Sequence, residues 1–390
     1  MYNKAMNMQY RAVGKTGIRA SVIGLGEEGL AKNPYPAMEG IIHAAMDAGV
    51  NIIDCFMPGK EIRTNIGKAI RGRRGRVLLQ GHIGSTDIHE QNDVSRDPAV
   101  CKKYFESLLA DLGTDYIDFG MFFFVDTPGD YRSVFEGELL EYARDLKKRG
   151  IIRAIGASCH NSVTGRRIVE SGCVDLIMFS VNPVFDMTPP DSDIYELLDD
   201  EKLKNGFSFK IEESRAALYR ICAEKEVGIT VMKTFCAGKL LSAEFTPFSA
   251  PMSAAQCIHY ALTRPAVVSV LPGCQSREEL FQALSYLDMS EEEKDYSGII
   301  GTYQGGFKGN CMYCNHCLPC PVSIDVAAVT KYLDIAALHK DAVPPSAAQH
   351  YLALEKHGSD CVSCGSCEKR CPFSVPVIKN MKKAAALFGA

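Results

Sequence analysis

Short apolar runs alternate with stretches of helical periodicity along most of the chain, at intervals of roughly 25 to 35 residues. Eight runs are predicted to be strands: VIGLG from Val22, NIID from Asn51, RVLLQGH from Arg76, YIDFGMFFF from Tyr116, IRAIGAS from Ile152, DLIMFSVN from Asp175, GITVMK from Gly228 and VVSVLPG from Val267. Amphipathic segments lie between them, such as ELLEYARDLKKRG, which ends in cationic residues before Gly150. Regular alternation of this kind predicts an α/β fold, a (β/α)8 TIM barrel, preceded by a short hairpin.

An open doubly wound sheet is the alternative architecture. Its glycine-rich strand end would be GLGEEG from Gly24, which lacks the third glycine of a dinucleotide-binding fingerprint. The long segment from Pro183 to Ile211 is either a lid over the carboxyl ends of the strands or a solvated surface loop.

A second domain is predicted after the barrel. Ser290 and Glu293 form a capping-box pattern that starts a connecting helix, and from Gly301 the chain becomes rich in cysteine, proline and glycine. We therefore predict a barrel domain over residues 1–290 and a small, mainly α, ferredoxin-like domain over 291–390.

Two cysteine runs, CMYCNHCLPCP and CVSCGSCEKRCP, dominate this second domain. Their spacing matches the bacterial two-cluster ferredoxin layout, in which three closely spaced thiolates hold one 4Fe–4S cluster and the fourth crosses to the other. The rule predicts a first set of Cys311, Cys314, Cys317 and Cys371, and a second set of Cys361, Cys364, Cys367 and Cys320. The first run has two residues before its last cysteine where the common pattern has three, and two four-cysteine zinc sites are the alternative.

Composition narrows the class of ligand and the compartment. A formal net charge of -4 provides no basic field for nucleic acid, which favours a small-molecule substrate. We expect no signal peptide and no membrane span, and hence a cytoplasmic protein whose 16 cysteines are reduced and available for metal or redox chemistry.

Several stretches together resemble the aldo-keto reductase family, over about Gln9 to Leu287: MQYRAVGKTGIRASVIGLG, AGVNIID, IGKAI, LGTDYIDF, IRAIGASCHN, GITVMKTFCAGKLL and VLPGCQSREEL. The cysteine-rich end resembles members that carry a ferredoxin-like extension. The resemblance implies hydride transfer from NADPH to a carbonyl, with a Tyr as acid supported by Lys, Asp and His.

The chain departs from this family pattern at most catalytic positions. Asp54 matches the family Asp, but Gly59 stands at the Tyr position, His82 at the Lys position and Phe123 at the His position. Cofactor positions have changed as well, at Met178, Cys159 and Ala283, whereas four others match the family: Ser158, Asn182, Gly238 and Gly273. These four are the candidate cofactor-binding residues. The sequence leaves open whether the cofactor that they bind is NADP(H).

Titratable and sulfur-bearing residues follow several predicted strands: Asp54, Cys55, His82, Cys159, His160, Lys233, Cys236 and Cys274. One interpretation is a metal, thiol or proton-relay site, and the other is that the cysteines are small buried apolar residues. Asp54 and His82 are the candidate catalytic pair, because a carboxylate beside an imidazole orients it as an acid or base.

The leading hypothesis is an iron–sulfur oxidoreductase. Two 4Fe–4S clusters would exchange electrons with a small substrate in the barrel mouth and with a redox partner protein, and no tyrosine-type hydride mechanism would operate. One alternative is an NAD(P)H-dependent carbonyl reductase with His82 or Lys60 as the acid. Another is a non-catalytic electron-carrier subunit.

Overall fold

The structure is a computed structural model that describes residues 7–89, 93–190, 192, 210–301, 303, 306–339 and 342–390. The chain forms two compact units. One comprises Met1–Val181, Val227–Thr234 and Val268–Met289, and the other Asn182–Glu226, Phe235–Val267 and Ser290–Ala390. Most of the predicted lid loop, Pro183 to Ile211, lies outside the described residues. In the described part of the chain, no helix combines the length and the apolar character that crossing a membrane requires.

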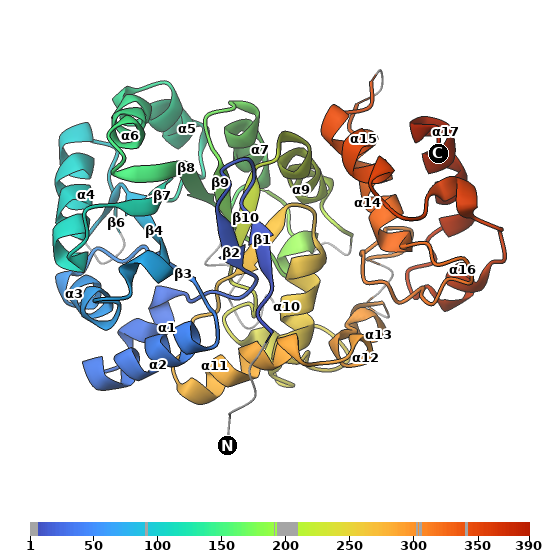
Figure 1. Cartoon of the computed structure of the whole chain (residues 1–390), viewed down its shortest axis with the longest axis horizontal. Helices are drawn as coiled ribbons and strands as arrows, with labels where there is room; N and C mark the ends of the chain where they lie inside the picture. The colour runs from blue at the N-terminus through green and yellow to red at the C-terminus, as the bar shows by residue number, and fades with distance from the viewer. Residues whose placement is uncertain are drawn as a thin grey trace. The chain divides into compact units, whose positions relative to one another are not determined.

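A seven-stranded sheet forms the framework of the first unit (Figure 1). Its order is β11-β10-β9-β8-β7-β4-β3, and the neighbouring pairs from β3 to β10 are parallel. The strands are β3 (Ile52–Cys55), β4 (Leu78–Ile83), β7 (Ile117–Phe122), β8 (Ile152–Cys159), β9 (Leu176–Ser180), β10 (Gly228–Met232) and β11 (Val267–Val270). Seven of the eight predicted strands are thus present, and in the predicted order.

The eighth predicted strand, from Val22, forms two single parallel bridges instead of a strand. Ile23 pairs with Val270 on β11 and Leu25 pairs with Ile53 on β3, so one segment joins both edges of the sheet. Gly24 passes between these edges, where a Cβ atom would lie 2.4 Å from Leu271 and 2.6 Å from Ile52. A parallel sheet whose edges are joined in this way is consistent with the predicted TIM-type barrel.

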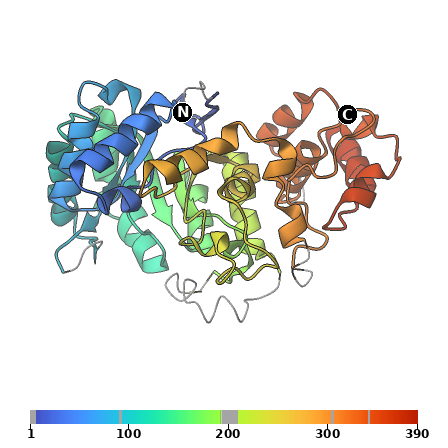
Figure 2. The ribbon, with the colours of Figure 1, turned by 90° about the horizontal axis from the view of Figure 1, so that it is seen from below.

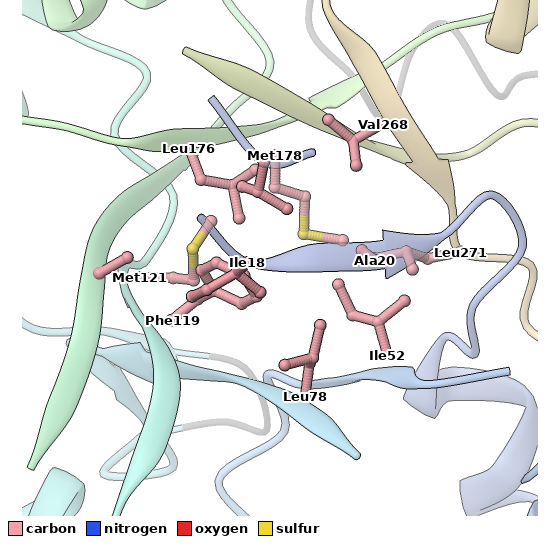
Figure 3. Close-up of a cluster of buried hydrophobic side chains, with 12 residues drawn as sticks. Ile18, Ala20, Ile52, Leu78, Phe119, Met121, Leu176, Met178, Val268 and Leu271 are labelled. Carbon is pink, nitrogen blue, oxygen red and sulfur yellow. The ribbon is translucent and has the colours of Figure 1, made fainter. Parts of the chain in front are cut away.

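Apolar side chains fill the inside of the curled sheet (Figure 3). Ile52, Leu78, Phe119, Leu176 and Val268 come from five different strands and meet there. The predicted N-terminal hairpin is present as antiparallel β1 (Tyr10–Ala12) and β2 (Arg19–Ser21). Because Ile18 and Ala20 of this hairpin belong to the same core, the hairpin covers the interior of the sheet.

Helices of the first unit lie outside its strands, as Figures 1 and 2 show. They are α1 (Glu27–Ala31), α2 (Tyr35–Asp47), α3 (Lys60–Ala69), α4 (Pro98–Leu112), α5 (Pro128–Phe135), α6 (Glu138–Lys148), α7 (Ser162–Glu170) and α11 (Arg277–Leu284). Local signals set their ends, as in α4, where Asp97 accepts a hydrogen bond from Val100 N and Gly113 ends the helix at φ 62°. A further antiparallel pair joins β5 (Ser85–Thr86) and β6 (Asp93–Val94).

The second unit consists of helices and loops in its described part. Its helices are α9 (Glu213–Lys225), α10 (Ala254–Thr263), α12 (Glu291–Lys294), α13 (Ser297–Ile300), α14 (Val326–Ala336), α15 (Pro345–Leu352), α16 (Ser366–Arg370) and α17 (Val377–Phe388). The capping box of Ser290 and Glu293 is present at the start of α12, as predicted. Helix α14 packs against α15 and α17. The ferredoxin-like assignment of this region stays a prediction.

Candidate functional site

Asp54 and His82 lie together at the carboxyl ends of β3 and β4. His82 Nε2 is 2.8 Å from Asp54 Oδ1, and Gln80 Nε2 donates to the same oxygen at 2.9 Å. Asp54 is 1% and His82 2% exposed, so the pair is almost completely buried. Within the described part of the chain, His82 Nδ1 and Gln80 Oε1 have no hydrogen-bond partner. The structure therefore brings the two predicted catalytic residues together and leaves one ring nitrogen available.

Aromatic rings cover this pair. The edge of the His82 ring meets Phe123 at a centroid distance of 5.4 Å, and Phe123 stacks on Phe56 at 6.2 Å. Phe123 stands where the family resemblance places a histidine, and it supplies apolar surface there instead. A ring in this position keeps water away from His82, which strengthens the electrostatic interaction with Asp54.

Glu27 of α1 adds a buried carboxyl group near the end of β3, which the sequence did not indicate. Its Oε2 accepts a hydrogen bond from Met57 N at 2.6 Å, and its Oε1 has no partner within the described residues. Burial, with a smaller contribution from the charge of Asp54, raises the pKa of Glu27 from 4.5 to about 8. In the sequence, Glu27 is one of two glutamates in the GLGEEG segment. The glycine pattern of that segment gives no sign of a buried carboxyl group.

A second polar centre joins the loops that follow β7, β8 and β10. His160 Nδ1 is 2.9 Å from Asp126 Oδ2, and His160 Nε2 is 3.1 Å from Lys233 Nζ. The Phe124 ring packs against His160 at 4.6 Å. Sequence reasoning placed His160 and Lys233 after their strands but missed Asp126, which lies four positions beyond the end of β7.

Hydrogen-bonding roles in this second centre follow from its chemistry. An ammonium group can only donate, so Lys233 Nζ donates to His160 Nε2, and His160 Nδ1–H donates to Asp126. Burial would raise the pKa of Asp126, but the hydrogen bond and charge of His160 outweigh it and lower that pKa below its ordinary value. The three residues therefore form a half-buried chain of Asp, His and Lys, with His160 in the middle.

Backbone strain marks the same place. Lys233 has φ +58° and Phe124 φ +53°, a left-handed conformation that is uncommon for residues other than glycine. Such outliers cluster at functional sites, where the surrounding structure holds a side chain in a required direction. The carboxyl ends of the strands are also where TIM barrels carry their active sites.

The four candidate cofactor-binding residues are described within their own units. In the first unit, Ser158 Oγ accepts a hydrogen bond from Phe124 N at 2.8 Å, and Gly273 lies exposed in the turn after β11. In the second, Asn182 Oδ1 accepts from Val184 N at 3.0 Å and from Phe185 N at 2.9 Å, and Gly238 has φ 85°. Ser158 and Asn182 thus hold loop backbone, and the assignment of these four residues to NADP(H) stays a prediction.

The cysteines near the strand ends are buried: Cys55, Cys159, Cys236 and Cys274 are between 0% and 2% exposed. Burial raises the pKa of Cys55, and it raises that of Cys274 to about 12. A thiol of this kind carries little thiolate at neutral pH, so it behaves as a small apolar residue.

The two cysteine runs of the second unit adopt the same backbone turns. The residues two after the first cysteine, Tyr313 and Ser363, have φ 51° and 55°, and those one after the second cysteine, Asn315 and Gly365, have φ 57° and 75°. Three residues after the last cysteine of each run, Ser323 and Ser374 have φ 60° and 53°. Non-glycine residues rarely adopt this conformation, so its repetition shows that the two runs are built to one plan.

The second cysteine set lines one cavity. Cys320 of the first run lies there with Cys361, Cys364 and Cys367 of the second run, around a hollow of about 380 Å³ that is open to solvent. In the first set, burial raises the pKa of Cys317 to about 12, with smaller contributions from the neighbouring thiols of Cys314 and Cys371. The structure thus places the fourth cysteine of each run near the other run.

The eight thiols of the two runs are of the donor type that a 4Fe–4S cluster takes. Within the described residues, no three His, Cys, Asp or Glu side chains lie close enough together to hold a single metal ion. A 4Fe–4S cluster binds each of four thiolates at a different iron, so its ligands are spaced more widely.

Comparisons with known proteins identify the barrel. Residues 22–252 match the model of the aldo/keto reductase family. The aldo-keto reductase YhdN of Bacillus subtilis (strain 168) is 31% identical over 163 residues, which cover 39% of this chain and 47% of that protein. The chain thus spans about half the length of this curated relative.

Solved structures share the fold. An aldo-keto reductase from Pseudomonas aeruginosa, PA4992, has a TM-score of 0.56 and 19% identity, with 74% of this chain and 97% of that chain covered. The aldo-keto reductase AKR11C1 from Bacillus halodurans in its holo form has a TM-score of 0.55 and 20% identity, with 74% and 94% covered. Because the family model spans more than half of its 390 residues, the chain belongs to the aldo/keto reductase family.

Proposed function

We propose that the protein is an iron–sulfur oxidoreductase of the aldo-keto reductase superfamily. Its cysteine runs would hold two 4Fe–4S clusters, and a small molecule bound in the barrel mouth would be the substrate. The observation that supports this proposal best is the cavity in which Cys320 joins Cys361, Cys364 and Cys367. A fourth ligand that crosses from the other run is the arrangement of two-cluster ferredoxins.

The chain's own residues would hold the clusters as two sets of thiolates, and the clusters would supply electrons one at a time. Left-handed turns recur at Tyr313 and Ser363, and main-chain groups of Tyr313 and Ser366 bond to the thiols of Cys311 and Cys364. Burial raises the pKa of the Cys311 thiol, and the backbone hydrogen bond from Tyr313 opposes that rise. The backbone hydrogen bond from Ser366 lowers the pKa of Cys364, which favours its thiolate form. Oriented N–H groups around negative sulfur are the local condition that a cluster needs.

Proton delivery would come from the mouth of the barrel. A two-electron reduction of a neutral substrate to a neutral product also takes up two protons. Lys233 is the only ammonium group in the Asp126–His160–Lys233 chain and would donate one proton from Nζ, with His160 holding the resulting amine in place. Asp54 and His82, buried behind Phe123, are the second candidate pair for handling a proton.

A tyrosine-type hydride mechanism would lack its tyrosine, lysine and histidine at the family positions, where only Asp54 matches. Gly59 caps the start of α3, and His82 occupies the lysine position. The phenol of that mechanism must be made acidic by a neighbouring ammonium group, and neither the phenol nor that ammonium stands at its family position here.

A second candidate function is NAD(P)H-dependent carbonyl reduction with a modified acid. The observation that favours it is Lys60, which is exposed at the first position of α3, next to the tyrosine position at Gly59. The third candidate is an electron-carrier subunit without a substrate of its own, which would receive electrons from one redox partner protein and pass them to another.

Three measurements on the full-length protein, purified without oxygen, test the proposal. We expect about eight iron and eight acid-labile sulfide atoms per chain, and an EPR spectrum of coupled reduced clusters after dithionite. A protein with bound zinc and no acid-labile sulfide would overturn the proposal. Quenching of NADPH fluorescence at micromolar concentrations would favour the second candidate, and its absence would eliminate that candidate.

A further inference from the structure

Arg264 directly follows α10, and its buried guanidinium group lies against the turn that carries the first cysteine set. The residue is 5% exposed. Its Nη2 donates to the main-chain oxygen of Met312, and its Nη1 lies 3.8 Å from Met312 Sδ. Met312 is the residue directly after Cys311 in the C-x-x-C turn. The guanidinium group is therefore attached to the backbone that carries the ligands of the first set.

Three tyrosines also hold Arg264 in this position. The Tyr296 hydroxyl donates to the same Met312 oxygen at 2.6 Å and accepts from Arg264 Nη2 at 3.0 Å. The guanidinium carbon also lies 4.5 Å from the centre of the Tyr260 ring and 5.4 Å from that of Tyr313. Stacking and hydrogen bonding together fix the direction of the charge.

No carboxylate neutralises Arg264 within the described part of the chain. The acid with the largest effect on it, Asp186, is already engaged by Arg215 at 3.2 Å, Tyr219 at 2.5 Å and Tyr260 at 2.7 Å. Arg264 Nε has no hydrogen-bond partner among those residues. A guanidinium group stays protonated in proteins, so its burial without an ion-pair partner is costly unless another anion lies nearby.

We propose that this anion is the cluster held by Cys311, Cys314, Cys317 and Cys371, and that Arg264 raises the reduction potential of that cluster. The inference rests on the proposed function. A 4Fe–4S cluster with four thiolate ligands is an anion that gains one more negative charge on reduction, so a fixed cation beside it favours the reduced form. Arg264 also lies within electrostatic range of the Cys314 thiol.

The second cysteine set lacks this arrangement. Val362, which corresponds to Met312, is 62% exposed, and no guanidinium group bonds to its carbonyl oxygen in the residues that the structure describes. Arg370 is the cation near Cys364, but it donates its hydrogen bonds to the carbonyl oxygens of Cys317 and Pro319. Among the described residues, a buried guanidinium group bonds to the turn of the first set and none bonds to the matching turn of the second. The two clusters would therefore have different electrostatic surroundings.

Two acids also face the first set, and substitutions at position 264 leave both in place. Asp295 is paired with His316 at 2.5 Å, and Asp334 accepts a hydrogen bond from Tyr313 at 2.7 Å. A comparison of substitutions at position 264 therefore isolates the charge of Arg264.

The test is an EPR-monitored redox titration of the full-length, cluster-loaded protein. Arg264→Met removes the charge, and Arg264→Lys keeps it. A third variant, Cys371→Ser, identifies which signal belongs to the first set. We expect Arg264→Met to shift the midpoint of that cluster to a lower potential and to leave the other midpoint in place, and Arg264→Lys to retain most of the wild-type value.

The alternative outcomes are distinct. Wild-type protein with no cluster signal would refute the proposed function itself. Two intact clusters whose midpoints do not move, or move equally, in Arg264→Met would refute only the role of Arg264. If Arg264→Met loses half of its iron, retention of both clusters in Arg264→Lys supports the electrostatic role. Loss of iron in both variants would show a structural role of the hydrogen bonds and refute the inference.

Discussion

Lys233 Nζ lies 3.1 Å from His160 Nε2, although the two residues are 73 positions apart in the sequence. The contact joins the residue after β10 to the residue after β8, and Asp126 continues it from the loop after β7. Residues that follow three strands of the sheet thus form one hydrogen-bonded group. The group lies at the carboxyl ends of the strands, where TIM barrels have their active sites.

Replacement of Lys233 by Met should abolish most of the substrate turnover. Loss of a positioned general acid typically lowers a rate by about 10² to 10⁴-fold. The measurement is the rate at which a small carbonyl or other substrate reoxidises the dithionite-reduced protein, with iron content checked in each variant. Lys60→Met is the matched control, because it removes an exposed lysine from the start of α3. A large loss with Lys60→Met and none with Lys233→Met would favour the second candidate function.

Glu27 should make the first unit less stable as the pH rises. Its pKa is 4.5 when unfolded and about 8 when folded, so the folded state binds the proton more tightly between these values. The stabilisation is therefore complete below about pH 4.5 and is lost as the pH rises through 8. Linkage gives a slope of up to about 1.4 kcal/mol per pH unit in this window.

Glu27→Gln tests this pH dependence. The amide oxygen can still accept the hydrogen bond from Met57 N, but the side chain no longer ionises. We expect the thermal midpoint of the variant to fall less between pH 5.5 and pH 8.5 than that of the wild type. The difference should correspond to about 1 kcal/mol or more in the free energy of unfolding. Parallel curves for the two proteins would contradict the raised pKa.

Serine substitutions test the crossing of the fourth cysteine. Cys320 lines a cavity with Cys361, so Cys320→Ser and Cys361→Ser should impair the same cluster. The double variant Cys320→Ser, Cys361→Ser should retain about half of the iron, and Cys320→Ser combined with Cys311→Ser should lose nearly all of it. The reverse result would mean that each run holds its own cluster. Cys173→Ser is the control, because Cys173 lies outside both runs.

Two glycine substitutions test the packing of the barrel helices. A Cβ at Gly67 of α3 would lie 2.3 Å from the Leu112 carbonyl oxygen, whereas a Cβ at Gly40 of α2 has no atom within 4 Å. Gly67→Ala should lower the free energy of unfolding by about 1 to 3 kcal/mol, because backbone must move. Gly40→Ala should raise it by about 0.5 to 1 kcal/mol through helix propensity. Denaturant titration measures both, and a stable Gly67→Ala variant would contradict the close contact of α3 and α4.

Local patterns in the sequence predicted the strands, the hairpin and the helix ends. Seven of the eight strands that periodicity predicted are present in their order, and Gly150 and Ser290 marked helix ends that the structure confirms. The contact of Asp54 with His82 could also be foreseen, because strands that follow each other in a barrel are neighbours and each residue ends its apolar run. These features depend on residues close in sequence or on one general rule of topology.

Tertiary structure alone decided which distant groups meet. The segment around Gly24 joins β3 and β11 by two single bridges, at Leu25 and Ile23, instead of a strand. The side chains of Ile52 and Leu271 leave no room for a Cβ at Gly24. Glu27 meets Met57 across 30 positions, and Arg264 meets Met312 across 48. Such contacts are set by the directions of loops and by packing between elements, which a periodic pattern does not encode. The sequence by itself therefore determined the barrel's elements and the cysteine spacing, and only the folded chain determined the Asp126–His160–Lys233 group and the buried charge beside Cys311.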